Sequence, residues 1–163
     1  MSYNAKIAEL AVLLGGRLAE TNERLSAAES CTGGWLSKAV TDIAGSSAWF
    51  DRGFVTYSNQ AKQDMLGVPE TVLREYGAVS EACVLAMVEG ALRHSLADVS
   101  VAISGIAGPG GATPDKPVGT VWLAWAKRGE TARAQRFLFA GDREAVRAQA
   151  VIAGLEGVLA LVS

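Results

Sequence analysis

Hydrophobic positions recur every three or four residues in several segments, which is the spacing of amphipathic helices. The first twenty residues carry such a stripe, Ile7, Leu10, Leu14 and Leu18. A longer helix is expected after Ser80-Glu81, with the stripe Leu85, Val88, Leu92 and Leu96. Three other helices are predicted, over 36–43, over 59–66 behind a Ser58 or Asn59 cap, and after an Asp142 cap.

Runs of aromatic and β-branched residues separate these helices and predict strands. Trp49–Tyr57 and Val99–Ile103 are strand candidates, and 24–29 is a short, ambiguous segment for which we favour a strand. Segments 120–126 and 131–139 are expected to pair as a hairpin. Because helices alternate with strands before a late hairpin, the sequence predicts a layered α/β domain with a mixed sheet.

Composition narrows the class of protein. The 163 residues fit one domain over 1–163, half of them are hydrophobic, and 20% are charged, so a buried core is expected. No apolar run approaches the ~20 residues of a membrane span, and no signal peptide is recognisable. A net charge of −2 without a basic block argues against nucleic-acid binding. Two cysteines and one histidine cannot form a Cys/His zinc site, so we expect a cytoplasmic protein with no metal or membrane partner.

Glycine is in excess, with eighteen residues, and it clusters at two places. The first is the segment Ser30-Cys31-Thr32-Gly33-Gly34, which joins a predicted strand to a predicted helix. Such a junction presents a hydroxyl and several unpaired backbone N–H groups, which can bind a phosphate or stabilise an oxyanion. The alternative is a helix cap with glycines that serve only a tight turn.

A serine nucleophile needs a base, and few residues qualify. The only histidine, His94, lies near the end of a helix and is better explained as solvated, so a Ser-His-Asp triad is not favoured. Lys62 is the best candidate base if burial lowers its pKa, with a surface lysine as the alternative. Cys31 is the rival nucleophile, whereas Cys83 is expected to be a core residue.

The second cluster is the loop 104–114, where four of the seven residues 105–111 are glycine. It follows a predicted strand, where α/β sheets bind ligands. It matches neither a Walker A loop nor a dinucleotide fingerprint, so ATP and dinucleotides lose support. A backbone nest for one phosphate or a planar ring remains possible, and so does a purely structural loop.

Six motifs in order resemble the CinA C-terminal domain family of nicotinamide-nucleotide amidases over roughly residues 5–160. They are Ala28-Glu29-Ser30-Cys31-Thr32-Gly33-Gly34, Tyr57-Ser58-Asn59-Gln60-Ala61-Lys62, Gly77-Ala78-Val79-Ser80-Glu81, Gly105-Ile106-Ala107-Gly108-Pro109-Gly110-Gly111, Lys116-Pro117-Val118-Gly119-Thr120-Val121 and Gly141-Asp142-Arg143. One departure is Ser104, where the family usually has threonine; the hydroxyl is kept and the methyl is lost.

The resemblance implies a three-layer α/β/α fold, commonly dimeric, in a stand-alone form without the family's molybdopterin-type domain. It implies a metal-independent, cofactor-free hydrolase that converts nicotinamide mononucleotide to nicotinic acid mononucleotide and ammonia in pyridine-nucleotide recycling. The family's serine nucleophile corresponds to Ser30, its lysine base to Lys62, and Tyr57 assists.

On this hypothesis the two glycine clusters hold the oxyanion and the nucleotide, and Arg143 meets the phosphate. The oxyanion and substrate-binding residues expected are Cys31, Thr32, Gly33, Gly34, Ser104, Gly105, Gly108, Gly110, Gly111, Thr113 and Arg143. The alternative function is a non-catalytic nucleotide-binding module with the same fold. A DNA-associated role finds no support in the charge balance.

Overall fold

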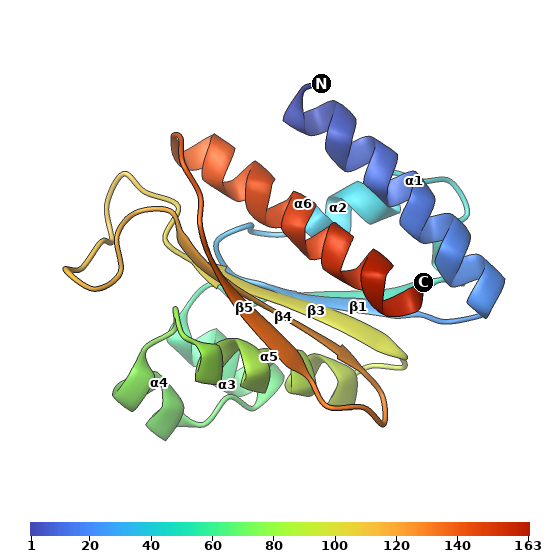
Figure 1. The fold of residues 1–163 in the computed structure, drawn as a ribbon. Coiled ribbons are helices and arrows are strands. Elements are labelled where there is room, and N and C mark those ends of the chain that lie inside the picture. The colour runs from blue at the N-terminus through green and yellow to red at the C-terminus, as the bar shows by residue number, and fades with distance from the viewer.

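A computed structural model describes all 163 residues, and a single mixed sheet of five strands runs through its centre (Figure 1). The strands are β1 (Leu25–Glu29), β2 (Phe50–Val55), β3 (Val99–Gly105), β4 (Thr120–Lys127) and β5 (Arg133–Leu138). Their order in the sheet is β2-β1-β3-β4-β5. The first three strands are parallel, and β4 and β5 continue the sheet antiparallel to them.

Helices cover both faces of the sheet, which makes the fold a three-layer α/β/α sandwich (Figure 1). On one face lie α1 (Tyr3–Thr21), α2 (Trp35–Thr41) and α6 (Arg143–Val162). On the other lie α3 (Asn59–Leu66), α4 (Glu70–Tyr76) and α5 (Glu81–Arg93). Each face has its own hydrophobic cluster, and the larger one packs α1 and α6 against the sheet. The predicted fold class is therefore confirmed.

The sheet topology determines where a site can form. Every residue of the inner strand β1 is buried, as expected for a strand covered on both faces. Because β2, β1 and β3 are parallel, their carboxyl ends meet at one edge of the sheet. Ser30 and Tyr57 lie in the segments that leave this edge, and Ser104 lies near the end of β3.

Most predicted elements are present, with bounds shifted by a few residues. Ser58 and Asp142 cap α3 and α6 as expected, each accepting a bond from a backbone N–H three residues on. The sequence did not predict α4 or the single 3-10 turn η1 (Ser46–Ala48). The assignment of Leu96 to the helical stripe was wrong, since α5 ends at Arg93 and the Leu96 side chain is 69% exposed.

The last helix, α6, is long and apolar enough to cross a membrane by length and composition alone. Half of that apolar stretch is buried within the protein, against α1 and the sheet. This burial is typical of a core helix, and the hydropathy of α6 carries no further conclusion.

Close packing of α5 against α3 gives the first prediction. A side chain at Gly90 would overlap the carbonyl oxygen of Leu66, the last residue of α3. Gly90→Ala should therefore lower the free energy of unfolding by about 1–3 kcal/mol, through overpacking that neither backbone can relieve. Chemical denaturation with circular dichroism measures this change.

The matched control is Gly16→Ala in α1, where an added Cβ meets nothing within 4 Å. Alanine is the better helix former, so Gly16→Ala should raise stability by up to ~1 kcal/mol. Equal effects at the two positions would contradict the assigned packing of α5 on α3.

Candidate active site

The Ser30 hydroxyl and the Lys62 amine meet at the carboxyl edge of the sheet. Lys62 Nζ lies 3.0 Å from Ser30 Oγ, although the two residues are 32 positions apart in the chain. Ser30 directly follows β1, and its backbone N–H donates to the carbonyl of Ile103 at 3.0 Å, which extends the pairing of β1 with β3. The sheet therefore fixes the serine from behind while its hydroxyl faces the lysine.

Lys62 is buried to an unusual degree for a lysine, with only 1% of its surface exposed. It lies in α3, and its Nζ also contacts the carbonyl oxygens of Thr56 at 2.9 Å and Tyr57 at 3.1 Å. No carboxylate contacts the amine. Burial lowers the pKa of Lys62 below its usual value, because desolvation penalises the ammonium form.

These three contacts suit a neutral amine. A neutral amine has two N–H bonds and one lone pair, and the two carbonyls accept the two N–H bonds. The lone pair is then left facing the Ser30 hydroxyl, which can donate its proton to it. The geometry thus joins a nucleophile to a base within hydrogen-bond reach.

Cys31, the rival nucleophile, is buried beside Ser30. Burial raises the pKa of the Cys31 thiol to about 11, and the nearby Glu29 charge adds to this while Arg147 opposes it. The thiol is therefore protonated at neutral pH and is a poor nucleophile. Cys83 is a buried core residue as predicted, with its pKa also raised to about 11 by burial. His94 caps the exposed end of α5, away from the site.

A cavity of about 250 Å³ opens over Ser30 and Lys62. Its other lining residues are Cys31, Tyr57, Asn59, Ala78, Val79, Ser104, Gly105, Ala107 and Arg143. Among them, the Ser104 side chain forms no hydrogen bond within the protein, so its hydroxyl is free to bind a ligand. A second cavity of about 460 Å³ shares Ala107 and Arg143 with the first and lies between the glycine loop and the start of α6.

Tyr57 contributes to this site differently from the expected role of its side chain. Its carbonyl accepts a hydrogen bond from Lys62, whereas its ring is 63% exposed. The Tyr57 hydroxyl lies 3.4 Å from a guanidinium nitrogen of Arg143 and bonds neither Ser30 nor Lys62. Arg143 also donates to the carbonyl of Gly108 at 2.8 Å, which ties the start of α6 to the glycine loop.

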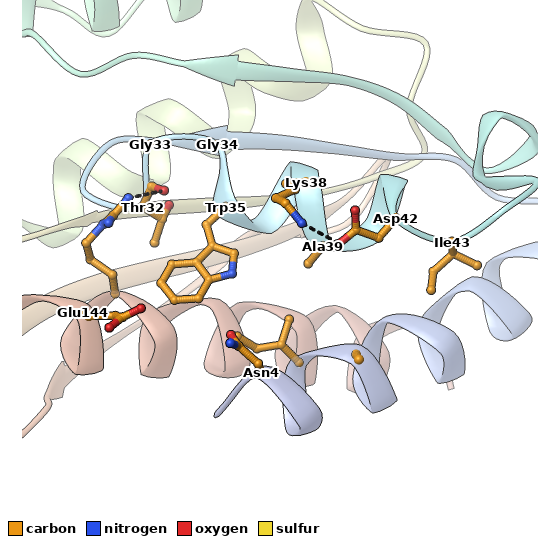
Figure 2. A pocket seen from close by; sticks show the side chains of 13 residues that line it. Asn4, Thr32, Gly33, Gly34, Trp35, Lys38, Ala39, Asp42, Ile43 and Glu144 are labelled. Carbon is orange, nitrogen blue, oxygen red and sulfur yellow. Dashed lines mark hydrogen bonds and ion pairs between the residues drawn. The ribbon is translucent and has the colours of Figure 1, made fainter. Parts of the chain in front are cut away.

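The residues of the glycine turn after Ser30 line two different cavities. Thr32, Gly33 and Gly34 line a different cavity of about 700 Å³ between α1, α2 and α6 (Figure 2). The Gly33 N–H is already bonded to the carbonyl of Ser30 at 3.1 Å. The N–H groups from Thr32 to Gly34, which the sequence predicts to hold the oxyanion, belong to residues that line this other cavity. The positive φ angles of Gly33 and Gly34, 57° and 102°, turn the chain into α2.

The glycine loop is also only partly at the site. Gly105 lines the Ser30 cavity, and Gly108 holds Arg143 through its carbonyl. Gly110, Gly111 and Thr113 are exposed and do not line it. The Thr113 hydroxyl donates to Asp115 at 2.9 Å, because the loop folds back on itself there.

Two charged residues near the turn were not predicted as site residues. Arg147 of α6 donates to the carbonyls of Cys31 at 2.9 Å and Thr32 at 3.2 Å. Glu29 is fully buried directly before Ser30. A carboxylate at the end of an apolar strand was a visible signal for Glu29, whereas an arginine within a helix gave none for Arg147. No three His, Cys, Asp or Glu side chains gather as metal ligands would.

A serine hydroxyl beside a buried lysine amine, at the carboxyl edge of an α/β sheet, places a candidate nucleophile within reach of a candidate base. The family model for the CinA C-terminal domain matches residues 7–162. The chain belongs to the CinA C-terminal domain family.

Relatives within the family differ in length. The nicotinamide-nucleotide amidohydrolase PncC of Pseudomonas putida is 54% identical over 155 residues, covering 95% of this chain and 96% of its own. A CinA-like protein of Akkermansia muciniphila is 57% identical over 141 residues, but the match covers only 34% of its length. The crystal structure of the competence/damage inducible protein CihA from Agrobacterium tumefaciens has a TM-score of 0.95 and 45% identity, covering 97% of this chain and 96% of its own.

The lowered pKa of Lys62 predicts the pH dependence of any reaction at Ser30. Activity should rise with pH as Lys62 loses its proton, with the midpoint of the rise below the usual lysine pKa of ~10.4. Steady-state rates across a pH series measure this limb.

The same shift affects stability, with a definite sign. Between the lowered pKa of folded Lys62 and the higher pKa of the unfolded chain, the unfolded state binds more protons. Stability contributed by Lys62 therefore increases with pH in that window. Lys62→Met should remove this increase and reduce the rate by a factor of at least ~100, because the side chain can no longer accept a proton. A pH limb that persists in Lys62→Met would contradict the assignment.

Proposed function

We propose that this protein is a nicotinamide mononucleotide amidohydrolase in which Ser30 is the nucleophile and Lys62 the general base. The observation that carries the proposal is the 3.0 Å contact between Ser30 Oγ and a buried Lys62 Nζ that has no carboxylate partner. The relatives of similar length named nicotinamide-nucleotide amidohydrolase PncC support the substrate.

In the first half of the reaction, Ser30 Oγ attacks the carboxamide carbon as its proton passes to neutral Lys62. The tetrahedral intermediate collapses when protonated Lys62 returns this proton to the leaving nitrogen, which departs as ammonia. The product of this half is an ester between the nicotinate carbonyl and Ser30.

In the second half, water replaces ammonia in the same positions. Lys62 takes a proton from the attacking water and delivers it to Ser30 Oγ as the ester breaks. Nicotinic acid mononucleotide leaves as a carboxylate, and the Ser30 hydroxyl is restored. One base serves both halves because its proton returns to the leaving group each time.

The negative oxygen of the intermediate needs donors beside Ser30. The backbone N–H groups of Cys31 and Thr32 donate to no other group in the protein. We assign these two N–H groups to the oxyanion because they directly follow Ser30, whereas the Gly33 N–H is bonded to the Ser30 carbonyl and Gly34 lies further along the turn. Arg147 donates to the Cys31 carbonyl, which shares a peptide group with the Thr32 N–H, and so holds that group from the other side. The Ser30 carbonyl, which shares a peptide group with the Cys31 N–H, accepts the Gly33 N–H.

The rest of the nucleotide is assigned to the two neighbouring cavities that share Ala107 and Arg143. The nicotinamide ring would occupy the cavity over Ser30, where the Ser104 hydroxyl is available to it. The ribose and phosphate would extend toward the second cavity, with Arg143 at the shared wall to bind the phosphate. No part of this arrangement uses Gly110, Gly111 or Thr113.

Loss of the nucleophile gives the direct test. Ser30→Ala should reduce ammonia release from nicotinamide mononucleotide by a factor of at least ~1,000 while the protein stays folded, because no other group can form the ester. Cys31→Ala is the matched control and should stay within about tenfold of wild type, since its thiol is protonated. The reverse result would make Cys31 the nucleophile.

The same assay separates catalysis from simple binding. Release of ammonia and nicotinic acid mononucleotide in equal amounts by the EDTA-treated wild-type protein would support the amidase function. Well-folded protein that releases neither, yet melts at a higher temperature with the nucleotide, would be a non-catalytic binding module.

We also propose a cytoplasmic homodimer. The edge strand β2 has no partner on its outer side, and exposed apolar side chains lie along and after it, with Val55 at 47% and Met65 at 41% exposure. Light scattering at micromolar concentration should give about twice the chain mass. Val55→Glu should shift it to one chain mass if β2 is at the interface, and an unchanged dimer would place the interface elsewhere.

A further inference from the structure

Glu29 is a fully buried carboxylate to which the reaction described above gives no task. It is the last residue of β1 and stands directly before the nucleophile. Burying a carboxylate is costly unless its charge is matched by strong hydrogen bonds. The hydrogen-bond donors around the Glu29 carboxylate therefore indicate its role.

Four donors surround this carboxylate, two on each oxygen. Oε1 accepts from the Thr32 hydroxyl at 2.7 Å and from the Leu36 N–H at 2.9 Å. Oε2 accepts from the N–H and the hydroxyl of Ser37, at 2.9 and 2.7 Å. A carboxylate accepts at both oxygens, whereas a glutamine amide would place two N–H bonds against donors on one side. The site thus requires the charged residue.

All four donors belong to the segment that follows Ser30. Thr32 lies in the turn, and Leu36 and Ser37 lie in the first turn of α2. Helix α2 has no side-chain cap from its own N-cap residue, Gly34, so Glu29 reaches forward to take that role. The carboxylate consequently fixes the path of the chain on which the Cys31 and Thr32 N–H groups sit.

The main chain of Glu29 restrains the base as well. The Glu29 carbonyl accepts the Thr56 N–H at 2.8 Å, and the Thr56 carbonyl in turn accepts from Lys62 at 2.9 Å. Glu29 therefore holds the turn after Ser30 with its side chain, and with its backbone it holds the Thr56 peptide group that binds the lysine. A substitution of the side chain changes only the first of these contacts.

We propose that Glu29 is a positioning residue, whose carboxylate holds the Cys31 and Thr32 N–H groups in the orientation that stabilises the oxyanion. This inference rests on the proposed serine amidase function. The other residues of β1 are uncharged, and Glu29 is the one charged side chain that this strand places beside the catalytic turn. One of the four bonds comes from Thr32 in the catalytic turn and three come from the start of α2, so the carboxylate restrains this segment within the turn and at its far end.

The substitution Glu29→Gln tests the proposal, because it removes the negative charge and keeps the size and shape of the side chain. Glu29→Gln should lower kcat by about ten- to a hundredfold, in the range that follows loss or misplacement of an oxyanion donor. KM for nicotinamide mononucleotide should stay within about threefold, because the ground-state amide makes little use of these donors. The pH limb assigned to Lys62 should keep its position, since the backbone seat of the lysine is unchanged.

Ser37→Ala is the matched control, because it removes one donor to Oε2 and leaves the carboxylate with both backbone N–H bonds. Its kcat should remain within about threefold of wild type. Rates are compared at a temperature where circular dichroism shows each variant fully folded. If Glu29→Gln does not fold, Thr32→Val takes its place: it removes the Thr32 bond to Oε1 at constant shape and should lower kcat three- to tenfold at unchanged KM.

Any of three results with folded Glu29→Gln, or with Thr32→Val in its place, would overturn the inference. The kcat could stay within threefold of wild type, the effect could be confined to KM, or the pH limb of the activity could be displaced. Failure of the proposed function itself is distinguishable, because wild-type protein would then release no ammonia at all. A kcat loss in Glu29→Gln that Ser37→Ala does not share supports the positioning role.

Discussion

The site depends on keeping the amine of Lys62 out of water without giving it a negative partner. An exposed lysine holds its proton at neutral pH, and a lysine paired with a carboxylate holds it more firmly. Here two backbone carbonyls and the Ser30 hydroxyl are the only groups within hydrogen-bond distance of Nζ. Burial then lowers the pKa, and the deprotonated amine can act as a base. The surrounding structure has to supply that burial at a fixed position.

Several features of the fold supply it. The parallel arrangement of β1 and β2 brings the residues after both strands to one edge of the sheet, so the Thr56 and Tyr57 carbonyls lie close to Ser30. The Ser58 cap starts α3 at once after β2, and α5 approaches α3 so closely that only glycine fits at position 90. The lysine is therefore enclosed by backbone and packing, which vary little with thermal motion.

The sequence predicted this site to the extent that local chemistry revealed it. Helical spacing, caps and β-branched runs located most elements, and the six motifs identified Ser30 and Lys62 as partners. The short helix α4 was missed because its seven residues lack a clear apolar stripe, and only Leu73 is buried. Leu96 had the right spacing for the α5 stripe, but spacing alone could not show that α5 ends three residues earlier. The positions of the remaining residues depend on tertiary structure, which the sequence does not reveal. Cys31 lines the Ser30 cavity while its neighbour Thr32 lines the cavity between α1, α2 and α6, and the Thr113 hydroxyl bonds Asp115.

Lys62 and Glu29, two buried ionisable side chains near Ser30, have opposite requirements for charge. Lys62 must lose its charge, and it is met by acceptors that do not raise its pKa strongly. Glu29 must keep an acceptor at both oxygens, and it is met by four donors. These four donors bind both oxygens of the carboxylate on the α2 side, and the carboxylate forms no ion pair with Lys62. Such an ion pair would favour the protonated amine. On the proposed mechanism, the same separation leaves the N–H groups after Ser30 for the developing oxyanion, while the base is held by other contacts on the opposite side of the serine.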